Sequence, residues 1–156
     1  MPTVKITATN LDNVQKALNN LGDMVQNPDE KLMRRLGDVG VEDTEQRFMT
    51  RGYNSWPALS PETVKHKHSD FVLIDSGAMF NSVTMQMLQP GVVVVKVPFG
   101  GKKHDSRVPE FHQEGTSKMP QRKIMAVTPQ LTTALKSTLQ LWVNDMVKAF
   151  RKTMRG

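Results

Sequence analysis

The segment that most constrains the fold of this chain lies near its C-terminus, where apolar residues recur at helical spacing. Intervals of three or four residues separate Leu131, Leu135, Leu139, Trp142, Met146 and Phe150. Residues at these intervals share one face of an α-helix. Thr128 and Pro129 suit the N-cap and the first helical position. The pattern predicts a helix over residues 129–154, and its apolar face needs another element to cover it.

A short strand and a helix are predicted at the start of the chain. Apolar and polar residues alternate over residues 4–8, which is typical of a half-buried strand. A helix capped by Asp12 is expected to follow, and its apolar face consists of Leu11, Val14, Leu18, Leu21 and Val25. Asn27 and Pro28 end this helix.

A second N-terminal helix is predicted to begin at Asp29 and to run to Phe48 or Met49. Negative charge in a first turn is favourable because it faces the positive end of the helix dipole. Gly37 and Gly40 disfavour this helix, since glycine in a helix interior costs backbone entropy. The apolar face of the helix consists of Leu32, Leu36 and Val39.

The middle of the chain predicts a hairpin. Residues 83–88 alternate, Pro90 and Gly91 form a turn, and residues 92–97 are rich in valine. A turn-rich loop over residues 51–61 and a short helix ending at Lys67 precede it. We therefore expect one domain over residues 1–156 of the α+β class, with N- and C-terminal helices packed on a small antiparallel β-sheet. Residues 99–109, polar and glycine-containing, are expected to form an exposed mobile loop.

The charge of the chain is concentrated in its C-terminal part. The whole chain has a formal net charge of +6, and residues 61–156 carry 14 Lys and Arg against 7 Asp and Glu. Such a surplus serves either contact with nucleic acid or simple solvation. No apolar run approaches the roughly 20 residues that span a bilayer, so no membrane contact is expected.

The sequence offers no recognisable chemistry. Without cysteine there is no thiolate zinc site and no thiol nucleophile. His66 and His68 are flanked by lysines that repel a dication. They are two residues apart, so on a helix their side chains point to different faces. His112 lies between two glutamates but no serine in a nucleophile turn accompanies it. We predict no catalytic residue, no cofactor and no metal.

Four local signatures carry more information because they occur in a fixed order. They are Arg51-Gly-Tyr-Asn-Ser-Trp-Pro-Ala-Leu-Ser-Pro-Glu-Thr63, Leu73-Ile-Asp-Ser-Gly-Ala-Met-Phe-Asn-Ser-Val83, His112-Gln-Glu-Gly-Thr116 and Met119-Pro-Gln-Arg122. Together they resemble the bacteriophage virion morphogenesis proteins, which are also called tail completion or neck proteins. The resemblance covers about residues 47–128.

The resemblance implies a structural virion protein of a tailed phage, made in the host cytoplasm and placed at the head–tail junction. Such a protein forms a ring of identical copies, contacts neighbouring neck or tail proteins, completes tail and neck assembly, and lets DNA pass. In that setting the residues assigned to the DNA-facing side are Lys102, Lys103 and Arg107. Those assigned to subunit contacts are Trp56, Arg122, Lys148, Arg151, Lys152 and Arg155.

Several alternatives stay open at this stage. Trp56 either covers the core of its own chain or fills a partner's pocket. Arg122 is expected to pair with a carboxylate of its own chain or of a neighbour. As a whole, the chain could instead be a sequence-independent DNA-binding protein or a phage-encoded hydrolase. A regulator that reads bases is disfavoured, because the last helix lacks a cluster of base-reading residues at its start.

Overall fold

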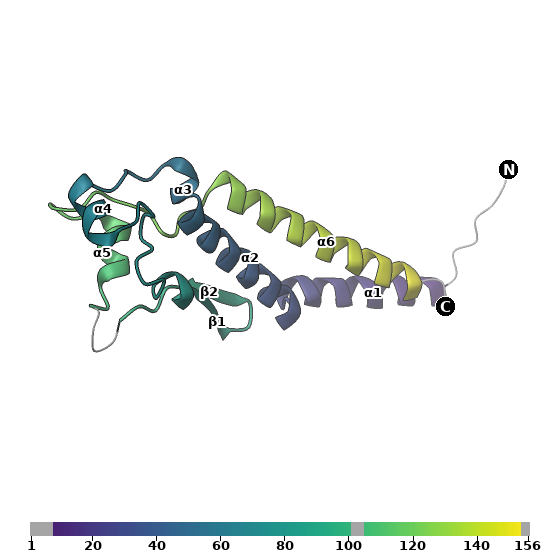
Figure 1. Cartoon of the computed structure of the whole chain (residues 1–156). Coiled ribbons are helices and arrows are strands. Elements are labelled where there is room, and N and C mark those ends of the chain that lie inside the picture. Colours follow the sequence, from purple (N-terminus) through teal and green to yellow (C-terminus); the bar gives the residue numbers. More distant parts are fainter. Residues whose placement is uncertain (1–7, 101–104, 154–156) are drawn as a thin grey trace.

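The computed structural model describes residues 8–100 and 105–153 of the chain (Figure 1). Most of the chain is helical, with one two-stranded sheet. The elements are α1 (Ala8–Gln26), α2 (Glu30–Met49), α3 (Arg51–Asn54), α4 (Pro61–Lys67), the 3₁₀ turn η1 (Phe80–Ser82), β1 (Thr84–Gln89), β2 (Val92–Lys96), α5 (Val108–Glu114) and α6 (Pro129–Thr153). The predicted α+β class is confirmed.

Helix α2 forms the central layer of the molecule. It packs against the hairpin on one side and against α6 on the other, and α6 runs in the opposite direction to α2 (Figure 1). Helix α1 contacts α6 near the C-terminal end of α6, and α3, α4 and α5 lie at the opposite end of the molecule. The element directly on the sheet is therefore α2, and α6 reaches the sheet only through α2.

The residues that disfavour α2 in the sequence are the ones that let the hairpin approach it. A Cβ atom on Gly37 would lie 2.8 Å from Cγ2 of Val93, and one on Gly40 would lie 2.6 Å from Cγ2 of Val95. Real side-chain carbons do not approach this closely, so the two glycines allow close helix–sheet packing. Asp29, predicted in the first turn, lies one residue before α2: its carboxylate accepts a hydrogen bond of 2.6 Å from the backbone N–H of Leu32 and caps the helix.

The hairpin forms where the sequence predicts it. β1 and β2 are antiparallel, with Thr84 opposite Lys96 and Met87 opposite Val93, and the register shifts between Met87 and Gln89. Gly91 has a φ of 77° in the connecting turn. One face of the hairpin is covered by α2, which explains why Val93 and Val95 are half-buried while Val94 between them is exposed.

The core lies between the C-terminal end of α2 and the loops beyond it. Its buried members are Phe48, Trp56, Val72, Met79 and Ile124. The ring of Phe48 makes edge-to-face contacts with Trp56 and Phe80, at centroid distances of 6.0 and 5.8 Å. Side chains from four separate segments thus close around the end of one helix.

Two details of the predicted elements are wrong. Helix α1 already begins at Ala8, so Asp12 lies inside the helix and does not cap it, because no breaker separates Ala8 from Leu11. Val4 and Ile6 of the predicted strand lie outside the described residues. The predicted loop over residues 99–109 contains the start of α5, which has Pro109 in its first turn and Gly115 at its end. The remaining part of that prediction falls on residues 101–104, outside the described range.

Candidate functional site

The first signature folds into a left-handed turn. Arg51, Gly52, Tyr53 and Asn54 all have positive φ values, between 53° and 67°. The hydroxyl of Thr50 accepts a hydrogen bond from the N–H of Tyr53, and the N–H of Trp56 donates to the carbonyl of Arg51 at 3.0 Å. This turn reverses the chain after α2 and directs the indole of Trp56 back toward Phe48.

The phenol of Tyr53 fastens the turn to α2. Its hydroxyl donates to Oδ1 of Asp43 at 2.8 Å, and Asp43 is itself buried. Burial and this hydrogen bond raise the pKa of Tyr53 to about 12. The pair satisfies a carboxylate that the packing of α2 against its neighbours removes from water.

Trp56 lies in the core of its own chain, as the core-lid interpretation expects. Its side chain is 8% exposed, and Nε1 donates to the carbonyl of Lys123 at 3.2 Å. Arg47 donates to the same carbonyl and to that of Ile124. The indole therefore joins the first signature to the segment that follows the fourth.

Arg122 is buried, and its partners differ from the predicted carboxylate. Nε donates to the carbonyl of Pro57 and Nη2 to the carbonyl of Ala58, each at 3.1 Å. The planar fork of a guanidinium matches two successive carbonyls, so it can be satisfied without an acid. Burial lowers the pKa of Arg122. Within the chain its function is to tie the fourth signature to the first.

All four signatures meet in this region. The N–H of Arg122 donates to the carbonyl of His112 at 2.7 Å, and the side-chain amide of Gln113 both donates to and accepts from the backbone of Met125. Met79 of the second signature packs in the same core as Trp56. The four signatures therefore form one structural unit, to which they contribute Trp56, Met79, His112 and Arg122 in turn. We call this unit the motif core.

A cavity of about 300 Å³ opens beside the motif core, between α4, α5 and the loop before η1. Its lining is mostly apolar and includes Leu59, Met79 and Phe99. Its polar members are Thr63, Lys67, Asp75, Ser76 and His112. Lys67 Nζ donates to the carbonyls of Phe71 and Ile74, which fixes it as a structural cation. Within residues 8–100 and 105–153, no group of three His, Asp or Glu side chains could hold a metal ion.

His112 gives the cavity a pH-dependent element. Its Nδ1 is buried and has no hydrogen-bond partner among the described residues. Burial, and then the positive charges of Arg122 and Lys67, lower the pKa of His112 from its ordinary value of 6.5. The neutral imidazole is therefore the form that the fold favours.

We expect acid to destabilise the chain through His112. The folded state binds this proton less readily than the unfolded state, so the free energy of unfolding falls as the pH drops below about 6.5. It levels off once the pH lies below the folded-state pKa. His112→Gln should flatten this part of the profile in urea unfolding between pH 5 and 8, whereas the exposed control His66→Gln should not. Parallel profiles for both variants would show that His112 contributes nothing.

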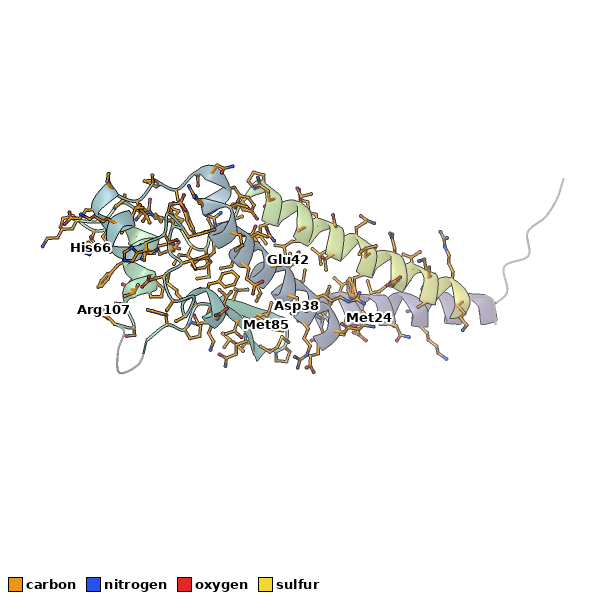
Figure 2. The ribbon with its side chains drawn as sticks, viewed as in Figure 1. Met24, Asp38, Glu42, His66, Met85 and Arg107 are labelled. Carbon is orange, nitrogen blue, oxygen red and sulfur yellow. The ribbon has the colours of Figure 1, made fainter. Side chains whose placement is uncertain are left out.

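The charged residues assigned from the sequence lie in two separate places. Arg107 is exposed beside α5, where it pairs with Asp105 at 2.8 Å and lies 5.2 Å from the ring of Phe111. Lys148, Arg151 and Lys152 are exposed near the C-terminal end of α6, at the opposite end of the molecule (Figures 1 and 2). The structure does not bring these clusters together. Lys102, Lys103 and Arg155 lie outside the described residues.

Sequence reasoning missed a surface made by α1 and α6. Leu139, which the periodicity places on the covered face of α6, is 40% exposed, and Val143 and Val147 are exposed beside it. Leu18 and Val25 of α1 are exposed as well, although they belong to the apolar stripe of that helix. The sequence does indicate this surface, because the apolar residues of α6 cover a wider part of the helix circumference than one partner helix can bury.

Exposed apolar helices beside a well-packed core are typical of chains that contact other proteins. The family model of the phage virion morphogenesis family matches residues 9–144, and the chain belongs to this family. It is a family of structural and assembly proteins of the virion. No curated protein and no solved structure matches the chain. In the described part of the chain, no helix is long and apolar enough to cross a membrane.

Proposed function

We propose that this chain is a structural protein of a tailed phage that forms a ring at the head–tail junction and completes the assembly of the neck and tail. The observation that carries the proposal is the family match over residues 9–144, which includes the motif core and most of α6. The chain works through its surfaces: the motif core fixes the relative positions of its elements, and the exposed helices and loops contact other subunits.

The proposal includes passage of DNA without reading its sequence. Arg107, beside the segment that contains Lys102 and Lys103, would then face the channel and contact phosphates. Its carboxylate partner Asp105 is exposed, so a phosphate can replace it at small cost. Neighbouring neck or tail proteins would contact the remaining surface of the ring.

Depletion of the protein during infection tests the proposal. We expect separate filled heads and tails in place of joined particles, and recovery of joined, infectious particles when the full chain is supplied in trans. The purified chain should have a mass several times that of the protomer at micromolar concentration. Joined and infectious particles that lack the protein would exclude a role at the junction.

The DNA contact is tested separately by the variant Lys102→Gln/Lys103→Gln/Arg107→Gln. It should still join heads to tails but deliver DNA poorly. Binding of the wild-type chain to short duplexes should be indifferent to sequence and should weaken steeply with salt, each lost phosphate contact lowering the salt slope by about one unit. Normal DNA delivery by the variant would contradict a channel-lining role.

A further inference from the structure

The pair of helices at one end of the molecule exposes a set of apolar side chains that its own chain does not cover. On α1, Leu18 is 56% and Val25 61% exposed, and on α6, Leu139 and Val143 are each 40% exposed. We call this set the apolar helix face; its members are Leu18, Met24, Val25, Leu139, Val143 and Val147. In the described part of the chain, α1 has its main packing contact with α6, and that contact leaves Leu18, Met24 and Val25 exposed.

The exposed residues of α6 form a second stripe beside the buried one. Leu139, Val143 and Val147 follow one another at intervals of four and lie along one line of the helix. Met146, on the adjacent line, is 8% exposed and faces the chain's own interior. A helix with two apolar stripes has two surfaces for packing, and neither α2 nor α1 covers this second stripe, whose residues stay exposed.

Two sets of opposite charge lie on these helices, and within the described residues they do not pair with each other. Asp38, Glu42 and Glu45 lie on one line of α2, which we call the acidic strip, and Figure 2 shows Asp38 and Glu42 on that helix. Lys148, Arg151 and Lys152 form the basic end of α6. Although α2 packs on α6, no ion pair joins the two sets within the described residues, and Lys148 has only the exposed Asp145 at 3.6 Å.

We propose that the apolar helix face docks one copy of this chain onto the next, with the basic end of α6 in one copy against the acidic strip of α2 in the other. The inference rests on the proposed function, because it names the surface by which the ring is joined. A second copy supplies both signs of charge at once, and each set then faces charges of the opposite sign on the neighbouring copy.

The arrangement of the charges favours a head-to-tail contact. The acidic strip and the basic end are different surfaces at different places along the molecule, so the contact joins unlike surfaces. A pair of copies therefore keeps one unused acidic strip and one unused basic end, to which further copies can bind. Repetition of such a heterologous contact continues until a rotation closes it into a ring. In this contact the apolar helix face provides the buried apolar area, and the opposite charges determine the relative orientation of the two copies.

Charge reversal tests the proposal with the full-length chain. The variants Asp38→Lys/Glu42→Lys and Arg151→Glu/Lys152→Glu should each self-associate about tenfold or more weakly than the wild type, because each places like charges across the contact. Mixed in equal amounts, the two variants should recover association, since every contact between unlike variants is complementary. Mass measurement at micromolar concentration and low salt reads out all three cases.

Three further variants test the specificity of the contact: two are controls outside it and one lies within it. Glu62→Lys and Lys65→Glu reverse exposed charges on α4, far from the proposed contact, and should associate like the wild type. Val143→Glu places a charge in the centre of the apolar helix face and should leave the protein monomeric with an unchanged circular dichroism spectrum. Its wild-type Val143 is exposed, so the substitution does not disturb the core.

Three results would overturn the inference while leaving the role at the junction intact. The first is unchanged association of the charge-reversed variants, and the second is failure of their mixture to recover association. The third is normal self-association of Val143→Glu together with a loss of head–tail joining; this result would assign the apolar helix face to a different neck protein. Binding of DNA by the wild type that is lost only in Arg151→Glu/Lys152→Glu would assign the basic end to DNA. Joined particles in the depletion experiment would instead remove the proposed function itself.

Discussion

Trp56→Ala is expected to lower the free energy of unfolding by about 3–5 kcal/mol, the usual cost of removing a large aromatic side chain from a core. The indole is 8% exposed, contacts Phe48 edge to face, and donates to the carbonyl of Lys123. Its removal leaves a cavity where the signatures meet, and the carbonyl of Lys123 loses one of its donors and keeps only Arg47. Urea unfolding followed by circular dichroism measures the loss.

The same variant separates the two interpretations of Trp56 that the sequence leaves open. A residue that fills a partner's pocket would leave the isolated chain as stable as the wild type and would impair only association. Trp56→Phe is the matched control: it keeps most of the apolar contact but loses the N–H donor, so it should cost only about 1–2 kcal/mol. Equal stability of Trp56→Ala and wild type, with association lost, would assign the residue to an interface.

The long elements could be predicted from the sequence because each has a clear period. The helical spacing of α6, the acidic start of α2 and the valine-rich second strand are local patterns, and local patterns define helices and hairpins. The glycines at positions 37 and 40 misled this reasoning, because their role depends on valines of the hairpin more than 50 residues later.

The motif core could be predicted only in part. The order of the four signatures indicated the family, but order does not reveal that the guanidinium of Arg122 lies on the carbonyls of Pro57 and Ala58. Carbonyl partners leave no trace in a sequence, since every residue has one, so a carboxylate was the natural expectation. For α5 the signal existed, in Pro109 at its start and Gly115 at its end.

The apolar helix face shows a different limit of periodicity. A repeat of three and four residues identifies an apolar face, but it does not say which of the apolar residues the chain itself covers. Leu139 and Met146 look equivalent in the sequence, yet one is 40% and the other 8% exposed. Only the packing of α6 on its neighbours distinguishes the stripe that stabilises the fold from the one left for a partner.

Gly52→Ala is expected to lower the free energy of unfolding by about 2–4 kcal/mol, from a left-handed backbone and a steric clash together. Arg51, Tyr53 and Asn54 show that residues with side chains can occupy this turn at positive φ. The clash therefore dominates: a Cβ on Gly52 would lie 2.4 Å from Cδ1 and Nε1 of Trp56. The indole must move, and its contacts with Phe48 and Lys123 weaken as it does.

Coupling between Gly52 and Trp56 provides the decisive check on this explanation. In the Trp56→Ala background, Gly52→Ala should cost only about 1 kcal/mol, because the ring that it displaces is absent and the backbone strain alone remains. Gly22→Ala is the control for the substitution itself: Gly22 lies inside α1 with nothing within 4 Å, so alanine should stabilise the helix by about 0.5–1 kcal/mol. If the costs of Gly52→Ala and Trp56→Ala simply add in the double variant, then contact with the indole is not the reason for glycine at position 52.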